Sequence, residues 1–247
     1  MAKQRAFTLV ELLVILAIIA LLLSILAPTI QRSYVLGERV TCFSNVGKLG
    51  QAWFCFTNDN LGIMPGGYTG SGNWIGKYEN SRVAVEVGQL YPYIKTVGVY
   101  RCPSDTSNHW WTYSISGPMN GEERSWGSHK DGQGKPKYLY TKFMELDDPT
   151  MSLVFMEEDD YRSGGNMNSW LTNPLGDSRE DQWIDYVVAW HDAGANLAMA
   201  DGHAEHWQWA DEKTCTYRAF YRNDPDGPDL RRLQKVYWPR SATRRNP

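Results

Sequence analysis

The chain has 247 residues and a formal net charge of −3. This length suits one fair-sized domain or two small ones. The charge balance provides no basic field of the kind that nucleic-acid binding requires, so no nucleic-acid partner is expected. The first 28 residues are far more apolar than the remainder, and only the remainder can form a water-soluble core.

The N-terminal segment has the length and composition of one membrane-spanning helix. Between Phe7 and Ala27 the apolar run is interrupted by three polar residues, Thr8, Glu11 and Ser24. About 20 apolar residues cross a bilayer as a helix. Lys3 and Arg5 precede the run, so the positive-inside rule predicts a cytoplasmic N-terminus and an exported remainder.

Glu11 separates three interpretations of this segment. A carboxylate in an apolar helix costs on the order of a few kcal/mol of insertion free energy. A secretory signal cut near Ala27 and a plain membrane anchor both leave that cost without a purpose. A buried charge is tolerated when it is paired, which predicts that Glu11 binds a cation of a neighbouring chain.

Residues 1–34 resemble the N-terminus of a type IV prepilin or a type II secretion pseudopilin. MAKQRA is similar to the short basic leader, and FTLVELL to the start of the apolar helix. The resemblance implies that a prepilin peptidase cuts between Ala6 and Phe7 and methylates the new amine of Phe7. Ala6 stands where that family nearly always has glycine. The amine of Phe7 would then be the cation that pairs with Glu11 of the next subunit.

The helix is expected to continue beyond the membrane, over residues 29–58. Pro28 lies where pilins commonly carry a kinking proline, and ending the span is its alternative role. An amphipathic pattern follows, and the residues predicted to form its apolar face are Leu36, Val40, Phe43, Val46, Gly47, Gly50 and Phe54. The two glycines weaken a helix, so they suggest close packing. The segment 58–62, NDNLG, predicts the end of the helix.

Residues 59–247 are predicted to form a globular, β-rich head. Glycine and proline are frequent, and short runs typical of strands occur at 99–102, 111–116, 152–157, 186–191 and 195–200. The acidic run 156–160 is interpreted as a strand end. The predicted fold class is α+β and pilin-like, with one long N-terminal helix packed on an antiparallel sheet.

A second resemblance lies in the head. His191 is followed by nine residues and then by Asp201 and Gly202. This is similar to the H-x9-DG region of prepilin-like families from planctomycete-type bacteria, which also commonly carry a cysteine after the membrane and a Cys-Pro-Ser-Asp segment, as here at Cys42 and 102–105. Asp-Gly between alternating runs predicts a tight primed hairpin turn. We expect His191 to form a hydrogen bond inside the head and brace this hairpin.

Two further features concern crosslinks and metals. The four cysteines permit two disulfides, and Cys42–Cys102 with Cys55–Cys215 is the preferred pairing because Cys42 and Cys102 fall in the family-like segments; free thiols are the alternative. Hard oxygen ligands on a turn suit calcium, and the candidate ligands in the segment 223–229 are Asp224, Asp226 and Asp229. Some major pseudopilins use calcium in a C-terminal loop. A solvated acidic turn is the alternative, and no other cofactor is expected.

These features predict a structural protein and not an enzyme. The chain is expected to be a subunit of a type IV pilus-like or type II secretion pseudopilus-like filament. The precursor would be a single-pass protein of the bacterial inner membrane, and the filament periplasmic or extracellular. The expected partners are the prepilin peptidase and identical or related subunits. The alternatives are a membrane-tethered head whose eleven tryptophans bind carbohydrate or another surface ligand, and a metal hydrolase built on the histidines and acids of 191–206.

Overall fold

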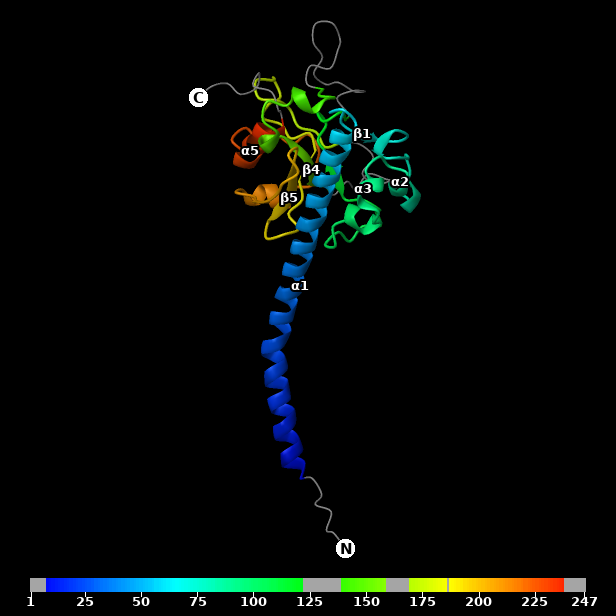
Figure 1. Cartoon of the computed structure of the whole chain (residues 1–247). Coiled ribbons are helices and arrows are strands. Elements are labelled where there is room, and N and C mark those ends of the chain that lie inside the picture. Colours follow the sequence, from blue (N-terminus) through cyan, green and yellow to red (C-terminus); the bar gives the residue numbers. More distant parts are fainter. Residues whose placement is uncertain (1–7, 122–138, 159–168, 186, 238–247) are drawn as a thin grey trace.

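The computed structural model describes residues 8–121, 139–158, 169–185 and 187–237. Its first element is a single helix, α1, which spans Leu9–Asp59 and extends far out of the head (Figure 1). At 1.5 Å per residue its 51 residues measure about 75 Å. The helix ends at Asn60, whose N–H donates to the carbonyl of Phe56. The long N-terminal helix expected from the sequence is therefore present.

The head begins with a small subdomain-like group of short elements beside α1. Strands β1 (Gly66–Thr69) and β2 (Asn73–Ile75) pair in parallel. They are followed by two short helices and a 3-10 turn: α2 (Arg82–Glu86), α3 (Tyr91–Ile94) and η1 (Val97–Tyr100). These elements pack near the C-terminal end of α1, as Figure 1 shows.

The main sheet is antiparallel and has the order β3-β4-β5-β6. Its strands are β3 (Tyr113–Ile115), β4 (Leu153–Glu157), β5 (Gly194–Met199) and β6 (Ala204–Gln208). Two 3-10 turns precede β4, η3 (Phe143–Glu145) and η4 (Pro149–Met151), and two helices follow β6, α4 (Glu212–Thr216) and α5 (Pro228–Tyr237). The predicted fold class, a long helix on an antiparallel sheet, is confirmed.

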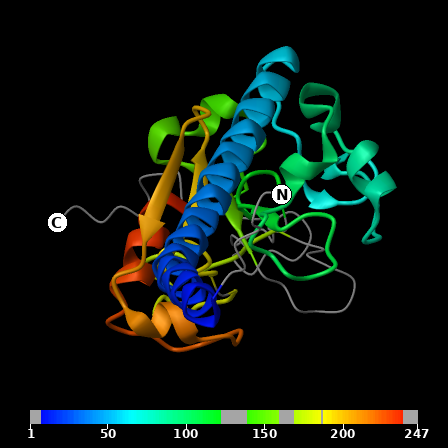
Figure 2. The same ribbon diagram turned by 90° about the horizontal axis from the view of Figure 1, so that it is seen from below.

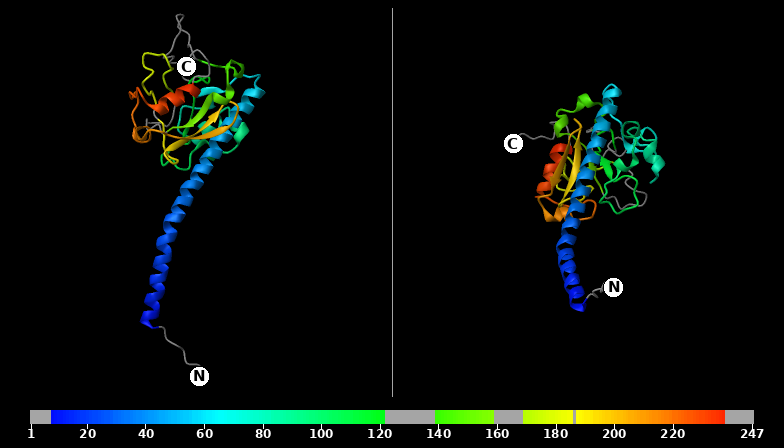
Figure 3. Two further views of the ribbon diagram at one scale, coloured as in Figure 1. Left: turned by 90° about the vertical axis from the view of Figure 1, so that its left-hand side faces the viewer. Right: turned by 60° about the horizontal axis from the view of Figure 1, so that its bottom comes forward.

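The sheet is covered on both faces. Helix α1 crosses one face and α5 packs on the other (Figures 2 and 3). Side chains alternate between the faces of a strand, and β5 follows this rule. Ala198 belongs to the core cluster under α1, whereas Leu197 and Met199 belong to the cluster that contains Leu230 and Leu233 of α5.

The face of α1 that packs on the head combines small residues with the large side chains of Leu49 and Trp53. Its buried residues are Cys42, Asn45, Val46, Leu49, Gly50, Ala52, Trp53 and Thr57. A Cβ built on Gly50 would lie only 2.8 Å from the Cβ of Ala198, so glycine is what permits this approach. Of the predicted face, Val46 and Gly50 are buried, but Leu36, Val40, Phe43 and Phe54 are exposed. The prediction included Leu36, Val40, Phe43 and Phe54, whereas the helix comes closest to the sheet at Gly50.

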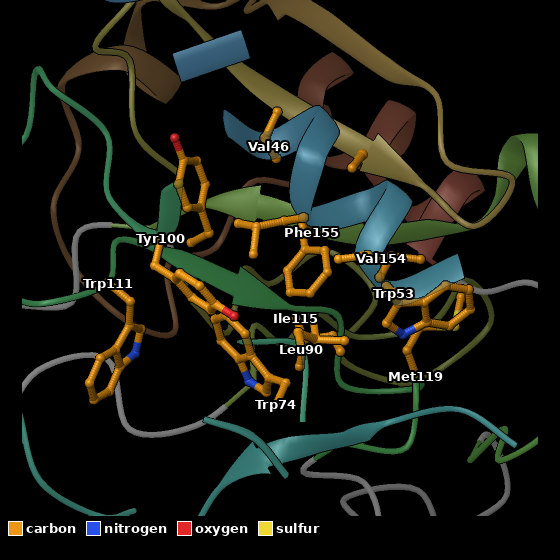
Figure 4. Close-up of a cluster of buried hydrophobic side chains, with 14 of the residues drawn as sticks. Val46, Trp53, Trp74, Leu90, Tyr100, Trp111, Ile115, Met119, Val154 and Phe155 are labelled. Carbon is orange, nitrogen blue, oxygen red and sulfur yellow. The ribbon is translucent and has the colours of Figure 1, made fainter. Parts of the chain in front are cut away.

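Aromatic side chains fill the space between the main sheet and the β1–β2 group (Figure 4). Trp53, Trp74, Tyr100 and Phe155 are fully buried there. The ring centroids of Trp74 and Phe155 lie 5.2 Å apart, and Trp74 stacks on Tyr100. Burial of such large rings is a major source of stability, so this cluster fixes α1 to the head.

The predicted strand runs are partly confirmed. The runs 111–116, 152–157 and 195–200 contain β3, β4 and β5. In contrast, the run 99–102 ends the 3-10 turn η1, and 187–191 contains no strand. Short apolar runs fit a buried loop as well as a strand, because only the neighbouring segment decides whether a ladder forms. Helix α5 was not predicted.

Candidate functional site

The N-terminal part of α1 is exposed. All side chains from Thr8 to Gly37 are exposed, including Leu9 at 80% and Leu22 at 61% of their full accessibility. In the described part of the chain, α1 is the helix that is long and apolar enough to cross a membrane, judged by length and composition. A surface of this kind is stable only in lipid or against other protein chains.

Glu11 forms a capping box at the start of this helix. The Thr8 hydroxyl accepts a hydrogen bond from the N–H of Glu11 at 3.2 Å. In return, Oε2 of Glu11 accepts bonds from the N–H and the hydroxyl of Thr8, at 2.9 and 2.7 Å. Both groups satisfy donors that a helix start leaves free. The carboxylate therefore has a local role, and Oε1 takes part in none of these bonds. The predicted cleavage and methylation residues, Ala6 and Phe7, lie outside the described residues.

Pro28 lies inside α1, which continues through it. Proline has no N–H, so the carbonyl four residues earlier loses its usual donor. The hydroxyl of the next residue, Thr29, donates to the carbonyl of Ile25 at 3.1 Å. Pro28 thus does not end the helix, and its role as a kink stays a prediction.

Four ionisable side chains from separate segments meet under α1. They are Cys42 of α1, Cys102 after η1, Glu157 at the end of β4 and His191 before β5, and all four are fully buried. Their ligand atoms lie within 4.8 Å of one another. The Cys42 thiol donates to Oε1 of Glu157 at 2.7 Å. Nε2 of His191 lies 2.9 Å from the same oxygen and 3.2 Å from Sγ of Cys102.

Neighbouring groups hold this cluster in place. The N–H of Asn196 donates to Oε2 of Glu157 at 2.5 Å, and the Tyr113 hydroxyl lies 3.0 Å from Sγ of Cys42. Burial alone would lower the pKa of His191, but its hydrogen bonds with Cys102 and Glu157 raise that pKa to about 10.

The four cysteines are free thiols in this structure. The preferred partners Cys42 and Cys102 are indeed brought together, but they are not bonded. Cys55 is exposed on α1, and Cys215 of α4 donates to the carbonyl of Ala193 instead. The expected pairing of Cys55 with Cys215 is therefore not formed.

The H-x9-DG segment connects this cluster to the tip of a hairpin. His191 was expected to form a hydrogen bond inside the head, and it does so through Cys102 and Glu157. At the other end, β5 and β6 form the predicted hairpin, but its turn is not the predicted primed type. Gly202 (φ +91°) has positive φ, whereas Asp201 does not, and the N–H of Met199 bonds the carbonyl of His203. This is a three-residue loop with glycine in the left-handed position.

The hairpin loop lies against α1. A Cβ built on Gly202 would be 3.8 Å from the Cα of Gln51. Oδ1 of Asp201 accepts hydrogen bonds from the N–H and from Nδ1 of His203, at 3.1 and 2.5 Å. His203 also contacts Glu205 through Nε2, at 3.1 Å. These loop residues are separate from the buried cluster, so the predicted hydrolase set of 191–206 does not converge on one point.

The predicted calcium ligands do not converge either. Asp224 accepts hydrogen bonds from Nε1 of Trp183 and from Arg222, at 2.9 and 2.8 Å. Asp229 is buried and accepts bonds from the N–H groups of Ala210 and Asp211. Asp226 is exposed. Because protein donors occupy two of the three carboxylates, this turn is arranged as a brace between segments, and the geometry gives the calcium hypothesis no support.

The tryptophans are mainly core residues. Trp207 and Trp209 are 4% and 5% exposed, and Trp111 is 1% exposed. Among the described tryptophans only Trp110 is exposed, at 40%. An isolated ring does not make a stacking platform, so the carbohydrate-binding alternative finds no support in the described residues.

Sequence reasoning missed Glu157 and the cluster to which it belongs. The acidic run 156–160 was interpreted as a strand end, but Glu157 is 0% exposed. One signal was available, because an acid that directly follows an apolar strand run is expensive to bury unless it has a partner. Its partners come from residues 42, 102 and 191, and nothing local in the sequence links these positions.

Comparison with known proteins identifies the N-terminal segment alone. Residues 1–27 match the family described as prokaryotic N-terminal methylation motif. Neither the curated proteins nor the solved structures contain a match to the chain. The motif is of the prepilin type, and it implies a pilin- or pseudopilin-like precursor that a prepilin peptidase processes. The match does not extend to the H-x9-DG segment.

Proposed function

We propose that this protein is a structural subunit of a type IV pilus-like or type II secretion pseudopilus-like filament. The precursor lies in the inner membrane with its N-terminus in the cytoplasm. The prepilin peptidase cuts it between Ala6 and Phe7, and the mature chain joins identical or related subunits through α1.

The observation that carries this proposal is the length of the exposed apolar surface on α1. A bilayer core is about 30 Å thick and needs about 20 helical residues. Exposed large apolar side chains continue past that length, to Leu36, Val40 and Phe43. A monomeric tether gains nothing from apolar residues outside the membrane. In a filament, the same side chains contact the α1 helices of neighbouring subunits.

Glu11 is the second support, because its capping box leaves a charge to be explained. Oε2 alone makes the bonds to Thr8, and an uncharged glutamine oxygen can make them as well. Capping thus accounts for a polar residue at position 11 and not for an anion. The Phe7 amine of an adjacent subunit is a cation of suitable depth, and pairing with it sets the axial offset between subunits.

Two substitutions separate capping from pairing. Glu11→Gln keeps an acceptor for Thr8 and removes the charge. Thr8→Ala removes the hydroxyl cap, at a cost of about 0.5–2 kcal/mol to the helix end, and keeps the charge. We expect Glu11→Gln to reduce filament yield at least tenfold and Thr8→Ala to leave most of it.

Filament yield is measured in the native cells as the sheared extracellular fraction relative to the membrane pool. Mass spectrometry of the wild-type N-terminus should find methylated Phe7. If Glu11→Gln gave the wild-type filament yield and Thr8→Ala gave a reduced one, the carboxylate would serve only to cap its own helix. The assembly proposal would then be wrong.

A further inference from the structure

We propose that Cys42, Cys102, Glu157 and His191 form a structural zinc site that fastens α1 to the head. Two thiolates, one imidazole and one carboxylate are donors that zinc accepts in a four-coordinate site. All four side chains are fully buried, and their ligand atoms lie within 4.8 Å of one another. The site is independent of the filament role proposed above.

The hydrogen bonds link the four side chains in series, and all four ligand atoms still lie close enough together to surround one ion. Oε1 of Glu157 lies within hydrogen-bonding distance of both Cys42 and His191, at 2.7 and 2.9 Å. Nε2 of His191 lies in turn near both Glu157 and Cys102. A single proton on Nε2 can donate well to only one of those two partners. An ion at the centre satisfies all four groups at once.

The distances require a small expansion of the cluster. With Zn–S near 2.3 Å and Zn–N and Zn–O near 2.0–2.2 Å, the edges of a tetrahedron are about 3.3–3.8 Å. The three observed donor separations are 2.7, 2.9 and 3.2 Å. Movements of under about 1 Å therefore open the site.

Surrounding groups already orient the ligands. Oε2 of Glu157 is held by the N–H of Asn196, which leaves Oε1 facing Cys42 and His191. The Tyr113 hydroxyl lies beside Sγ of Cys42 and can donate to a thiolate there. Metal ligands are typically fixed by outer partners of this kind. Nδ1 of His191 is buried without a hydrogen-bond partner in the described part of the chain.

The donor set favours zinc over other common cations. Calcium and magnesium require oxygen ligands, and here only one of four donors is oxygen. Two cysteines with one histidine match the borderline-soft character of zinc, and full burial leaves no open position of the kind that catalytic zinc needs. The site is therefore structural.

The position of the site gives it a mechanical role. Cys42 is the first buried residue of α1, at the point where the helix enters the head. The other ligands follow η1, end β4 and precede β5. One ion would join four separate segments at the place where a pull on the exposed helix reaches the head.

The test uses the full-length protein, extracted from native membranes in detergent without chelator. In a parallel sample, free thiols are alkylated during extraction. Elemental analysis by mass spectrometry should find one zinc per chain. After removal of zinc, Co²⁺ should restore the metal content and give the visible bands of tetrahedral cobalt together with a thiolate-to-metal charge-transfer band.

Substitutions locate the ion. Cys42→Ser, Cys102→Ser and His191→Asn should each reduce zinc content at least tenfold. The matched control is Cys55→Ser with Cys215→Ser, which removes the two remaining thiols and should retain full zinc content. If a ligand variant fails to fold, the cobalt spectrum of the wild-type protein still decides, because its charge-transfer band requires bound thiolates.

Two results would overturn the proposal. One is a Cys42–Cys102 disulfide in the alkylated native sample, identified by a crosslinked peptide. The other is a folded protein with free thiols that binds neither zinc nor Co²⁺ at stoichiometric concentration. Zinc that persists in the three ligand variants would equally place the ion elsewhere.

Discussion

The two halves of α1 belong to one unbroken helix but obtain their stability from different sources. Side chains from Thr8 to Gly37 are exposed, whereas eight residues between Cys42 and Thr57 are buried against the head. The outer half has large aliphatic side chains on every side. The inner half has both small residues and the large Leu49 and Trp53 on its buried face, and it carries Phe43 and Phe54 on its exposed face.

This difference shows that size alone does not indicate which side of a helix is internal. In the inner half the head selects glycine at position 50, because the Cβ of Ala198 approaches too closely for a larger side chain. In the outer half nothing within the chain selects a face. Its partners are lipid or other helices, and an all-round apolar surface suits both.

The largest expected effect contrasts a core residue of the inner half with a leucine of the outer half. Trp53→Ala removes a fully buried indole and should lower the free energy of unfolding of the head by about 3–5 kcal/mol. Leu16→Ala changes a side chain that is 58% exposed and should leave head stability unchanged. Thermal unfolding of the full chain in detergent measures both. Equal losses would show that the two halves are not energetically separate.

The second effect tests the close approach within the inner half. Gly50→Ala places a Cβ 2.8 Å from that of Ala198 and should destabilise the head by about 1–3 kcal/mol. Gly47→Ala is the matched control, since its Cβ meets Ala204 at an ordinary 3.5 Å. The better helix propensity of alanine should then stabilise the protein by up to about 1 kcal/mol. Denaturant midpoints of the two variants should move in opposite directions, and a shift in the same direction would contradict the packing described here.

The smallest effect concerns the hairpin loop that rests on the inner half. Burial alone would lower the pKa of His203, but hydrogen bonds and charge interactions with Glu205 and Asp201 raise it overall. The stability that this raised pKa provides is fully present below the unfolded value near 6.5 and is lost as pH rises through the folded value. The groups are partly exposed and screened, so about 0.2–1 kcal/mol is expected.

His203→Ala is the variant for this measurement. Its melting temperature should lie below that of the wild type at pH 5.5 and approach it at pH 9. His109→Ala serves as the control, because no described hydrogen bond joins His109 to Asp201 or Glu205. If the melting temperatures of His203→Ala and the wild type differed by the same amount at all pH values, titration of His203 would not be the cause of the difference.

The sequence predicts the long helix and the strands for local reasons. The apolar run after Phe7 and the alternation in 195–200 each carry a period that a single element imposes. The orientation of α1 is not local, because it depends on Ala198 and Ala204 of strands more than 140 residues away. The same reason hid the cluster of Cys42, Cys102, Glu157 and His191, whose members are combined by the fold alone.

The prediction of a primed turn was wrong for a related reason. Asp-Gly favours a two-residue loop when the strands on both sides set the register. Here Ala200 bonds the carbonyl of Ser152 and stays outside the β5–β6 ladder, so the loop gains one residue. Tertiary contact of one strand end with the preceding segment therefore decided the turn type.

The nine residues between His191 and Asp201 set the distance between two points where this segment approaches α1. One end is buried with Cys42, and the other lies over Gln51, so this stretch approaches α1 at two positions along the helix. Loss of a single residue would shorten this segment and also invert which side chains of β5 face the helix. Length and phase must both be kept, which is a stricter demand than any one of its side chains makes.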